Sequence, residues 1–490
     1  MKIFTAKKIF VDGKFEEKLA VVVSGEKIED IISHHEVEHF KNFAEFYDFG
    51  ENLLLPGFID THTHMMGYGL NTTNNLNSTM SWEEAEEVIK KTLTSFESDV
   101  YIFTDFDESK WRKNKLPTRK DIDKISSKKA IFLRRICGHI GVGNTAFINL
   151  ISGNPAFDPA KLSENEGIFI EDVPLHIYDI FPPSEEVMEK AFEVSQKKFL
   201  EEGITTISEI GNKRAFRFLQ RKWKKGELKL RIRYYLSDVD PDHIISSGFE
   251  TGLGDHNFKF MGIKFFADGS VGGESAYFSF PYGDNKSQGV LLLPDNFFEI
   301  AEKCVSNQIQ LAIHAIGDFA IKKVIEILEA LTNPGLVRIE HFEFPDKDDI
   351  KKISKLKIKL SIQPNFIENW GMEGGMYHKK LGDFYKSNNP LKTLISAGVN
   401  FAFGSDAMPP SPLAGIIAST KHPLEEERLS IEEAIPFYTE WGGHLTFEQN
   451  IIGKIKPRYL ADFVVVDKNF RKVIATFVGG NEVYDGRGDS

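Results

Sequence analysis

The sequence predicts an α/β fold: a (β/α)8 TIM-like barrel with a small β-sandwich built from both chain ends and an insertion after the first barrel strand. Three observations lead to this prediction. Short, almost continuously apolar runs alternate with amphipathic helical patterns through the middle of the 490-residue chain. The two ends instead carry alternating runs broken by Asp-Gly and Ser-Gly turns. The gap between the first two apolar runs is far too long for a simple crossover.

The β-sandwich is predicted from residues 1–55 together with residues 443–490. Runs such as "KIFTAKKIFVDGKF" near the N-terminus and "KVIATFVGGNEVYDG" near the C-terminus have the pattern of hairpins in a small antiparallel sheet. Because the two ends share this pattern and the middle lacks it, we expect them to pair. Residues 56–442 then form one continuous barrel domain between them.

Eight apolar runs in the middle have the length and composition of buried parallel strands. Most of the later ones are followed by an amphipathic helix, such as "DFAIKKVIEILEALTN". Eight such strands in βα order indicate a (β/α)8 barrel. The runs are residues 53–62, 203–210, 228–236, 258–268, 310–317, 337–343, 358–366 and 399–407.

The insertion is expected at residues 66–202. It carries its own helix ("SWEEAEEVIKKTLTSF"), a strand-like run ("KKAIFLRRICGHIGVG") and a second helix ("SEEVMEKAFEVSQKKFLEEG"). We expect this segment to fold over one mouth of the barrel and to cover the substrate.

The bulk properties exclude several classes of protein. The formal charge of −12 disfavours a nucleic-acid partner. No segment reaches about 18 consecutive apolar residues and the N-terminus has no signal-peptide pattern, so we expect no membrane partner. Cys137 and Cys304 lie far apart, which fits the reducing cytoplasm. A homodimer is among the assemblies that the sequence permits.

Polar residues that interrupt the predicted strands collect at the C-terminal ends, where barrel enzymes carry their catalytic groups. Each residue alone has a structural explanation, as a core histidine, a turn or helix cap, or a lysine that reaches to water. Together they occupy five strands, and imidazole with carboxylate suits a divalent metal such as zinc. The residues are His62, His64, Lys264, His314, His341 and Asp406.

Lys264 raises a particular question, because it lies in the middle of the apolar run "FKFMGIKFFADGS". An isolated ammonium in such a place costs several kcal/mol unless it is paired or neutralised. Burial also lowers the pKa of a lysine, which makes the neutral amine accessible.

The motifs "GFIDTHTH", "KFFADGS", "HAIGD", "RIEH", "QP" and "GSD" resemble those of the amidohydrolase superfamily. The chain is most similar to the YtcJ-like branch, which includes N-substituted formamide deformylases and chains labelled exoenzyme regulatory proteins. The resemblance covers nearly the whole chain. It implies an elliptical barrel with a flanking β-sandwich, and a site for one or two divalent metals, usually zinc.

The resemblance also implies roles for the ligands. His62 and His64 would hold the more buried metal together with Asp406, and His314 and His341 would hold the second. Lys264 would bridge the two as a carbamate formed with carbon dioxide, and the metals would compensate its charge.

The implied chemistry is hydrolysis of a small-molecule amide by metal-activated water. Asp406 would take the proton from that water and return it to the leaving nitrogen. His139, in "CGHI", is a candidate for binding the carbonyl or the substrate, although a structural histidine in a turn fits equally well. Asp318 either orients His314 or caps the next helix.

One departure from the branch concerns the substrate. After "ADGS" the branch commonly has an arginine, whereas this chain has Glu274 in "VGGESA". The expected function is therefore hydrolysis of a non-peptide carbon–nitrogen bond, in an N-acyl, N-formyl or cyclic amide. An aminohydrolase acting on a heterocycle and a non-catalytic regulatory protein on the same fold are the alternatives.

Overall fold

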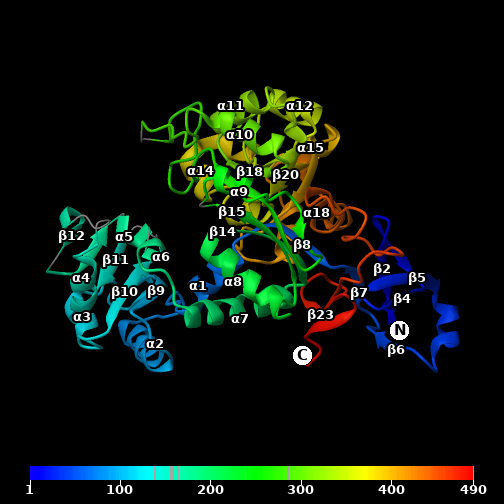
Figure 1. Cartoon of the computed structure of the whole chain (residues 1–490), viewed down its shortest axis with the longest axis horizontal. Coiled ribbons are helices and arrows are strands. Elements are labelled where there is room, and N and C mark those ends of the chain that lie inside the picture. The colour runs from blue at the N-terminus through cyan, green and yellow to red at the C-terminus, as the bar shows by residue number, and fades with distance from the viewer. Residues whose placement is uncertain are drawn as a thin grey trace. The chain divides into compact units, whose positions relative to one another are not determined.

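The structure is a computed structural model, and it describes residues 1–136, 140–154, 159–163, 165–170, 172–175, 177–237, 239–283 and 286–488. Contacts within the chain define two compact units. One consists of Met1–His64 with Gln196–Ser490, and the other consists of Met65–Ser195. Figure 1 shows the elements of both.

A parallel sheet forms the centre of the first unit (Figure 1). Its strands follow in the order β8, β14, β15, β17, β18, β19, β20 and β21, and every neighbouring pair is parallel. The last strand returns to the first, because Thr61 Oγ1 donates to Phe403 O (2.9 Å) and Asp406 N donates to His62 O (2.8 Å). The predicted (β/α)8 barrel is therefore confirmed. The strands are β8 Phe58–Thr63, β14 Ile204–Gly211, β15 Arg231–Leu236, β17 Phe258–Phe266, β18 Gln310–Ala315, β19 Val337–His341, β20 Lys359–Ile362 and β21 Asn400–Phe403.

Helices follow the strands, and α11 illustrates why. Its apolar residues recur at helical spacing, so Ala320, Val324 and Leu328 are buried on one face of the helix. The principal helices of this unit are α8 Lys213–Lys224, α9 Pro241–Ser246, α10 Phe297–Ser306, α11 Asp318–Leu328, α12 Lys347–Leu356, α13 Asn365–Asn369, α14 Met376–Leu381, α15 Leu391–Ser396, α16 Pro412–Ser419, α17 Ile431–Ala434 and α18 Glu440–Leu445.

The apolar run at residues 53–62 is two strands and not one. β7 pairs with strands of the chain ends, and β8 begins the barrel. Gly57 separates them at a close approach, since a Cβ there would lie 2.4 Å from the side chain of Thr205. Periodicity did not reveal this break, because both strands are buried throughout.

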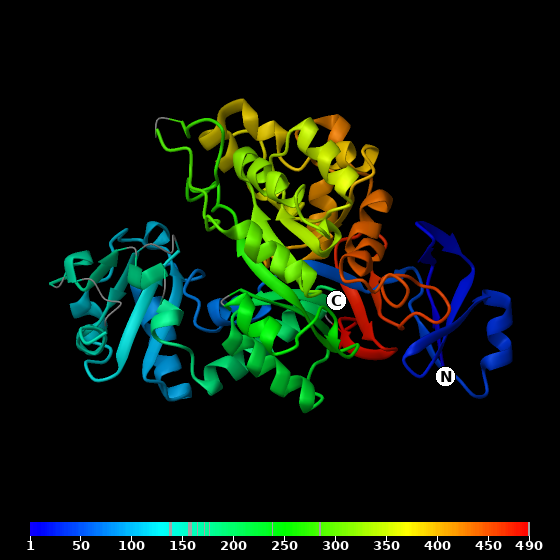
Figure 2. The same cartoon turned by 45° about the horizontal axis from the view of Figure 1, so that its top comes forward.

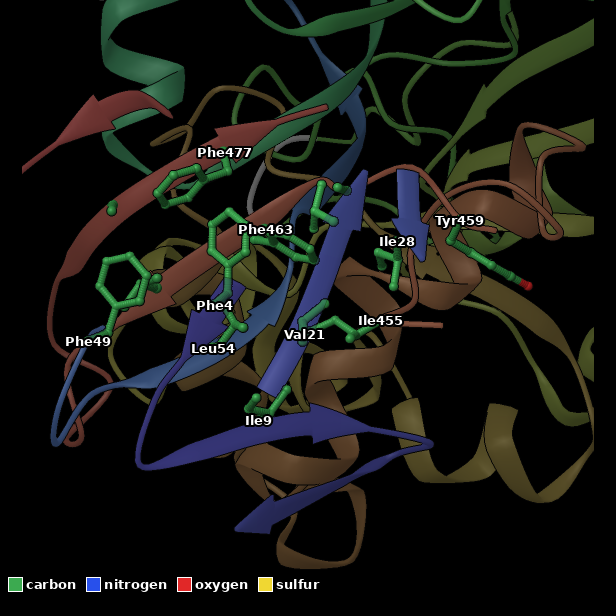
Figure 3. Close-up of a cluster of buried hydrophobic side chains, with 14 of the residues drawn as sticks. Phe4, Ile9, Val21, Ile28, Phe49, Leu54, Ile455, Tyr459, Phe463 and Phe477 are labelled. Carbon is green, nitrogen blue, oxygen red and sulfur yellow. The ribbon is translucent and has the colours of Figure 1, made fainter. Parts of the chain in front are cut away.

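Strands from both chain ends form two further sheets. One has the order β5-β4-β1-β6, and the other has the order β24-β23-β22-β7-β2-β3. They share an apolar core that includes Phe4, Val21, Leu54, Phe463 and Phe477 (Figure 3). The strands are β1 Lys2–Thr5, β2 Lys8–Val11, β3 Lys14–Glu17, β4 Leu19–Ser24, β5 Lys27–Ser33, β6 Glu45–Asp48, β7 Leu53–Pro56, β22 Phe463–Val466, β23 Val473–Val478 and β24 Asn481–Asp485.

The second unit has its own sheet, in the order β12-β13-β11-β10-β9, drawn mostly in cyan in Figure 2. Apolar clusters lie on both faces of this sheet, with Phe103 and Ile131 in one and Phe132 and Phe147 in the other. No described helix of the chain is both long and apolar enough to cross a membrane. The elements are α1 Met65–Thr73, α2 Trp82–Ser95, β9 Val100–Phe106, α3 Arg119–Asp123, β10 Ala130–Arg135, β11 Ile140–Gly143, α4 Thr145–Ile151, β12 Leu162–Ser163, β13 Ile168–Ile170, α5 Asp172–Leu175, α6 Ile177–Ile180 and α7 Glu185–Glu201, which ends in the first unit.

Candidate metal centre

Three of the predicted ligands converge where β8 and β21 end. One donor atom each of His62, His64 and Asp406 lies within 4.8 Å of the other two. The close approach of β21 to β8 requires a glycine at position 404, because a Cβ there would lie 2.6 Å from the backbone nitrogen of His62. Asp406 itself has a positive φ of 54°, a conformation that a residue other than glycine adopts at a cost.

The second nitrogen of each histidine is already committed. His62 Nδ1 contacts Glu340 Oε2 at 2.5 Å, and His64 Nδ1 donates to Ile210 O at 2.9 Å. These bonds leave both Nε2 atoms as acceptors, 3.5 Å and 3.2 Å from Asp406 Oδ1. With neutral imidazoles, three electron-pair donors therefore face one another. This arrangement is unfavourable unless a positive charge lies among them, either a metal ion or a proton on His64 Nε2.

A buried ion pair supports His62 from behind. Arg338 Nε donates to Glu340 Oε1 (2.5 Å), and its Nη2 donates to Glu340 Oε2 (2.8 Å). Burial opposes ionisation of Glu340, but the Arg338 guanidinium outweighs it and holds the pKa of that carboxyl below its ordinary value. A carboxylate that holds the far nitrogen of a metal-ligating histidine fixes both its tautomer and its orientation.

His314 and His341 lie next to this group. The His341 ring centroid is 4.7 Å from that of His62 and 4.4 Å from that of His314. Burial lowers the pKa of His314 to about 3 and that of His341 well below its ordinary value, so both rings are neutral donors of electron pairs. His341 Nδ1 is buried without a hydrogen-bond partner among the described residues.

Lys264 lies in β17 and is 2% exposed, so nearly all of its side chain is buried. Its Nζ lies 5.0 Å from the centroid of Phe266, and no described residue accepts a hydrogen bond from it. Burial lowers its pKa to about 8. The electrostatic influence of Glu340 and Asp406 on this group shows that it lies within reach of the cluster.

Two buried aspartates were not among the predicted site residues, although both lie in the quoted motifs. Asp60 binds the Ser405 backbone and hydroxyl (2.9 and 2.5 Å), which ties β8 to the loop that carries Asp406. Asp268 accepts hydrogen bonds from the backbone nitrogens of Ile316 and Gly317 (3.0 and 2.9 Å). Their signal in the sequence is a carboxylate inside or directly after an apolar run, the same signal that singled out Lys264.

The sequence also singled out His139, Asp318 and Glu274. His139 lies outside the described residues. Asp318 begins α11 and accepts from Ser279 N (2.8 Å), so it neither caps the helix by its side chain nor orients His314. The carboxylate nearest to His314 is Asp268, 3.5 Å from its Nε2. Glu274 pairs with Lys380 at 2.5 Å.

The donor set fits a divalent metal. Imidazole nitrogens and a carboxylate oxygen are ordinary ligands of zinc, and the protein holds the second nitrogen of both histidines. Burial opposes a charge on His64, yet the hydrogen bond and charge of Asp406 raise its pKa. The cluster therefore attracts positive charge, and a cation held by His62, His64 and Asp406 would supply it.

The chain is similar to known proteins over most of its length. A model of the amidohydrolase family matches residues 45–484. The chain is 27% identical over 451 residues to the putative amidohydrolase YtcJ of Bacillus subtilis, covering 84% of each chain. It is 22% identical over 516 residues to the N-substituted formamide deformylase of Arthrobacter pascens, covering 96% of this chain and 93% of that one. These matches confirm the resemblance inferred from the motifs.

Solved structures share the fold. An uncharacterized metal-dependent hydrolase from Pyrococcus furiosus superimposes with a TM-score of 0.84 at 24% identity, covering 96% of this chain and 100% of that one. A guanine deaminase from C. acetobutylicum has a TM-score of 0.54 at 12% identity, covering 99% and 100%. The fold is therefore common to enzymes that act on different bonds.

Proposed function

Because the chain belongs to the amidohydrolase family, whose members are metal-dependent hydrolases, we propose that it hydrolyses a non-peptide carbon–nitrogen bond. The substrate class is a small N-acyl, N-formyl or cyclic amide. The similarity to an N-substituted formamide deformylase supports an amide over other substrates.

The observation that carries the proposal is the convergence of one donor atom each of His62, His64 and Asp406, with the far nitrogen of each histidine held by the protein. These residues would hold a zinc ion, which would supply a Lewis acid and would lower the pKa of a bound water from 15.7 to about 7. The protein's own contribution is to fix the ligands through Glu340, Arg338 and the Ile210 carbonyl, so that little reorganisation accompanies the reaction.

Asp406 is the proposed proton carrier. Burial opposes its ionisation, but the neighbouring imidazoles and Lys264 outweigh burial and hold the pKa of Asp406 below its ordinary value. The ionised carboxylate accepts a proton from the attacking water and returns it to the leaving nitrogen, which completes the hydrolysis with one water consumed.

We further propose that Lys264 is carboxylated and that two metals are bound, the second by His314 and His341. The lowered pKa makes the neutral amine available, and its nitrogen adds to the carbon of carbon dioxide with loss of one proton. The resulting oxygen anion takes the place of an ammonium that no described residue binds. Mass spectrometry of the intact, metal-loaded protein tests this: an added mass of about 44 Da, absent in Lys264→Met, is expected from the formula of carbon dioxide.

The function is tested by a screen of the zinc-loaded protein against N-formyl, N-acyl and cyclic amides. We expect turnover of at least one class, its loss on removal of zinc, and its recovery on return of zinc. Turnover should also be lost in Asp406→Asn. The matched control is Asp348→Asn, which should keep turnover because Asp348 lies on the surface of α12 with 81% of its side chain exposed. No turnover of any amide, in a protein that binds zinc, would overturn the proposal.

A deaminase of a heterocycle is the second candidate. His62, His64 and Asp406 form the one group of three or more metal-ligating side chains found among the described residues, which suits a single metal. Ammonia release from aminoheterocycles in the same screen, with one zinc per chain and an unmodified Lys264, would favour this candidate.

A further inference from the structure

Four buried side chains near the metal centre each keep one oxygen without a hydrogen-bond partner among the described residues. They are 0–2% exposed. Leaving a buried acceptor unpaired destabilises the folded protein, so native proteins rarely keep several such atoms together without a reason. The atoms are Glu343 Oε1, Gln363 Oε1, Asn365 Oδ1 and Asn389 Oδ1.

The partner atoms of these side chains are committed, which fixes the orientation of the open oxygens. Asn365 Nδ2 donates to Ser405 O (2.9 Å) and Met408 O (2.7 Å), so its oxygen must point elsewhere. Tyr377 donates to Glu343 Oε2 at 2.6 Å. The unpartnered atoms of the group are therefore all oxygens, and we call the group the acceptor cluster.

The four residues lie together at the ends of β19 and β20. Asn389 joins the two strands, because its N donates to Glu343 O (2.8 Å) and its Nδ2 donates to Gln363 O (3.4 Å). The cluster also adjoins the proposed metal ligands. Glu343 follows His341 by two residues, and Asn365 holds the carbonyl of Ser405, which directly precedes Asp406.

Aromatic rings line the same ends of the strands. The Phe344 and Tyr377 rings lie 5.6 Å apart between centroids, and Phe366 stacks on His341 at 6.0 Å. These rings provide apolar contact and negative ring faces, and both favour an organic cation over a hydrated one.

We propose that the acceptor cluster binds a protonated amino group of the substrate. A primary ammonium has three donors and no acceptor, which matches a site with four unpartnered oxygens. Such charge-assisted bonds are the strong ones. The inference rests on the proposed amide hydrolysis in one respect. If the protein hydrolyses amides, the preferred substrates are amides that carry a second, cationic nitrogen. Binding of the ammonium itself does not depend on hydrolysis.

The first test measures binding to the zinc-loaded protein at pH 7, with n-alkylammonium ions of three to six carbons and the alcohols of the same length as probes. One or more charged hydrogen bonds predict a preference for the ammonium of about 10-fold to 100-fold. Equal affinity for the two series would overturn the proposal.

Variants locate the preference. Glu343→Gln and Asn389→Leu are expected to reduce it to below about 3-fold, since each removes an acceptor. Glu427→Gln is the matched control: Glu427 is also buried, but it binds Lys392 N and Thr393 N, and it should leave the preference unchanged. A preference that survives both cluster variants would place the amine elsewhere, on the metal for example, and would contradict the proposal.

Turnover separates this inference from the function on which it rests. N-formyl-α,ω-diaminoalkanes should exceed N-formylalkylamines of equal length in kcat/KM by about 10-fold or more. Selective ammonium binding without any hydrolysis would refute the function and keep the subsite. Hydrolysis of both series at equal kcat/KM, or a crystal structure with water or a metal ion on all four oxygens in the presence of the ammonium, would refute the subsite.

Discussion

The two ends of the barrel both bury charged side chains, but they use them in opposite ways. At the N-terminal ends of the strands three such cations have a carboxylate partner from the C-terminal segment. Arg231 binds Asp462 through two bonds of 2.8 and 2.9 Å, and Arg233 and Lys259 both bind Glu448, at 2.5 and 2.7 Å. At the C-terminal ends, the donor atoms of His62, His64 and Asp406 face one another and can take up a positive charge.

This difference separates stability from function. A closed buried pair connects distant parts of the chain and leaves nothing for a ligand, which suits the end of a barrel associated with stability. Open donors of one kind are unfavourable for folding by themselves and are retained where they bind a metal or a substrate. The comparison predicts that substitutions at the two ends have separable effects.

The largest effect is expected for Asp406→Asn. Loss of the proton carrier and of one metal ligand should lower kcat by about three orders of magnitude, while the free energy of unfolding changes little. Steady-state kinetics and urea denaturation measure the two quantities. Unchanged turnover would remove Asp406 from the mechanism, and a large loss of stability would contradict the proposed separation.

Arg231→Met tests the other end. It leaves Asp462 buried with only the backbone of Gly479 as a described partner, so we expect the free energy of unfolding to fall by about 3–5 kcal/mol. The surface variant Lys351→Met, which breaks an exposed pair, should change it by less than about 1 kcal/mol. The zinc affinity of the folded Arg231→Met protein should equal that of the wild type.

Glu340→Asp is expected to weaken zinc binding by about 10-fold to 100-fold, because it keeps a charge for Arg338 but withdraws the carboxylate from His62. Competition with a chelator of known affinity measures this. Glu448→Asp makes the same change at the closed end, and it should lower stability without altering the affinity for zinc. Equal zinc affinities of Glu340→Asp and Glu448→Asp would show that Glu340 does not position His62.

The smallest effect concerns Lys359, at the start of β20. Its Nζ lies 3.3 Å from the centroid of Phe447, and burial lowers its pKa to about 7. The unfolded chain then binds more protons between pH 7 and about 10.4, so stability should rise with pH across that window. The increase in melting temperature from pH 7 to pH 9.5 should be larger in the wild type than in Lys359→Met, where this contribution is absent. An identical pH dependence in the two proteins would contradict the shift.

Much of this arrangement could be predicted from the sequence, because buried parallel strands are nearly continuous apolar runs and any polar residue within them stands out. That signal singled out His62, Lys264 and His341, and the structure places the rings of His62 and His341 next to each other. It did not separate β7 from β8, since both are buried throughout, and it gave no partner for Lys264.

Other features depend on contacts between residues far apart in the chain. Asp60 and Ser405 are 345 residues apart, and Asn365 meets the carbonyl of Ser405 only because β20 and β21 are neighbours. A single sequence does not show which side-chain atoms remain unpaired after such contacts form. The acceptor cluster therefore became visible only in the structure.

The central claim is that His62, His64 and Asp406 hold a metal at the open end of the barrel. Anomalous diffraction at the zinc edge, from crystals of the zinc-loaded protein, tests it most directly. We expect a strong anomalous peak within about 2.0–2.2 Å of His62 Nε2, His64 Nε2 and an Asp406 carboxylate oxygen. Zinc bound only elsewhere, with these three side chains free of metal, would contradict the account.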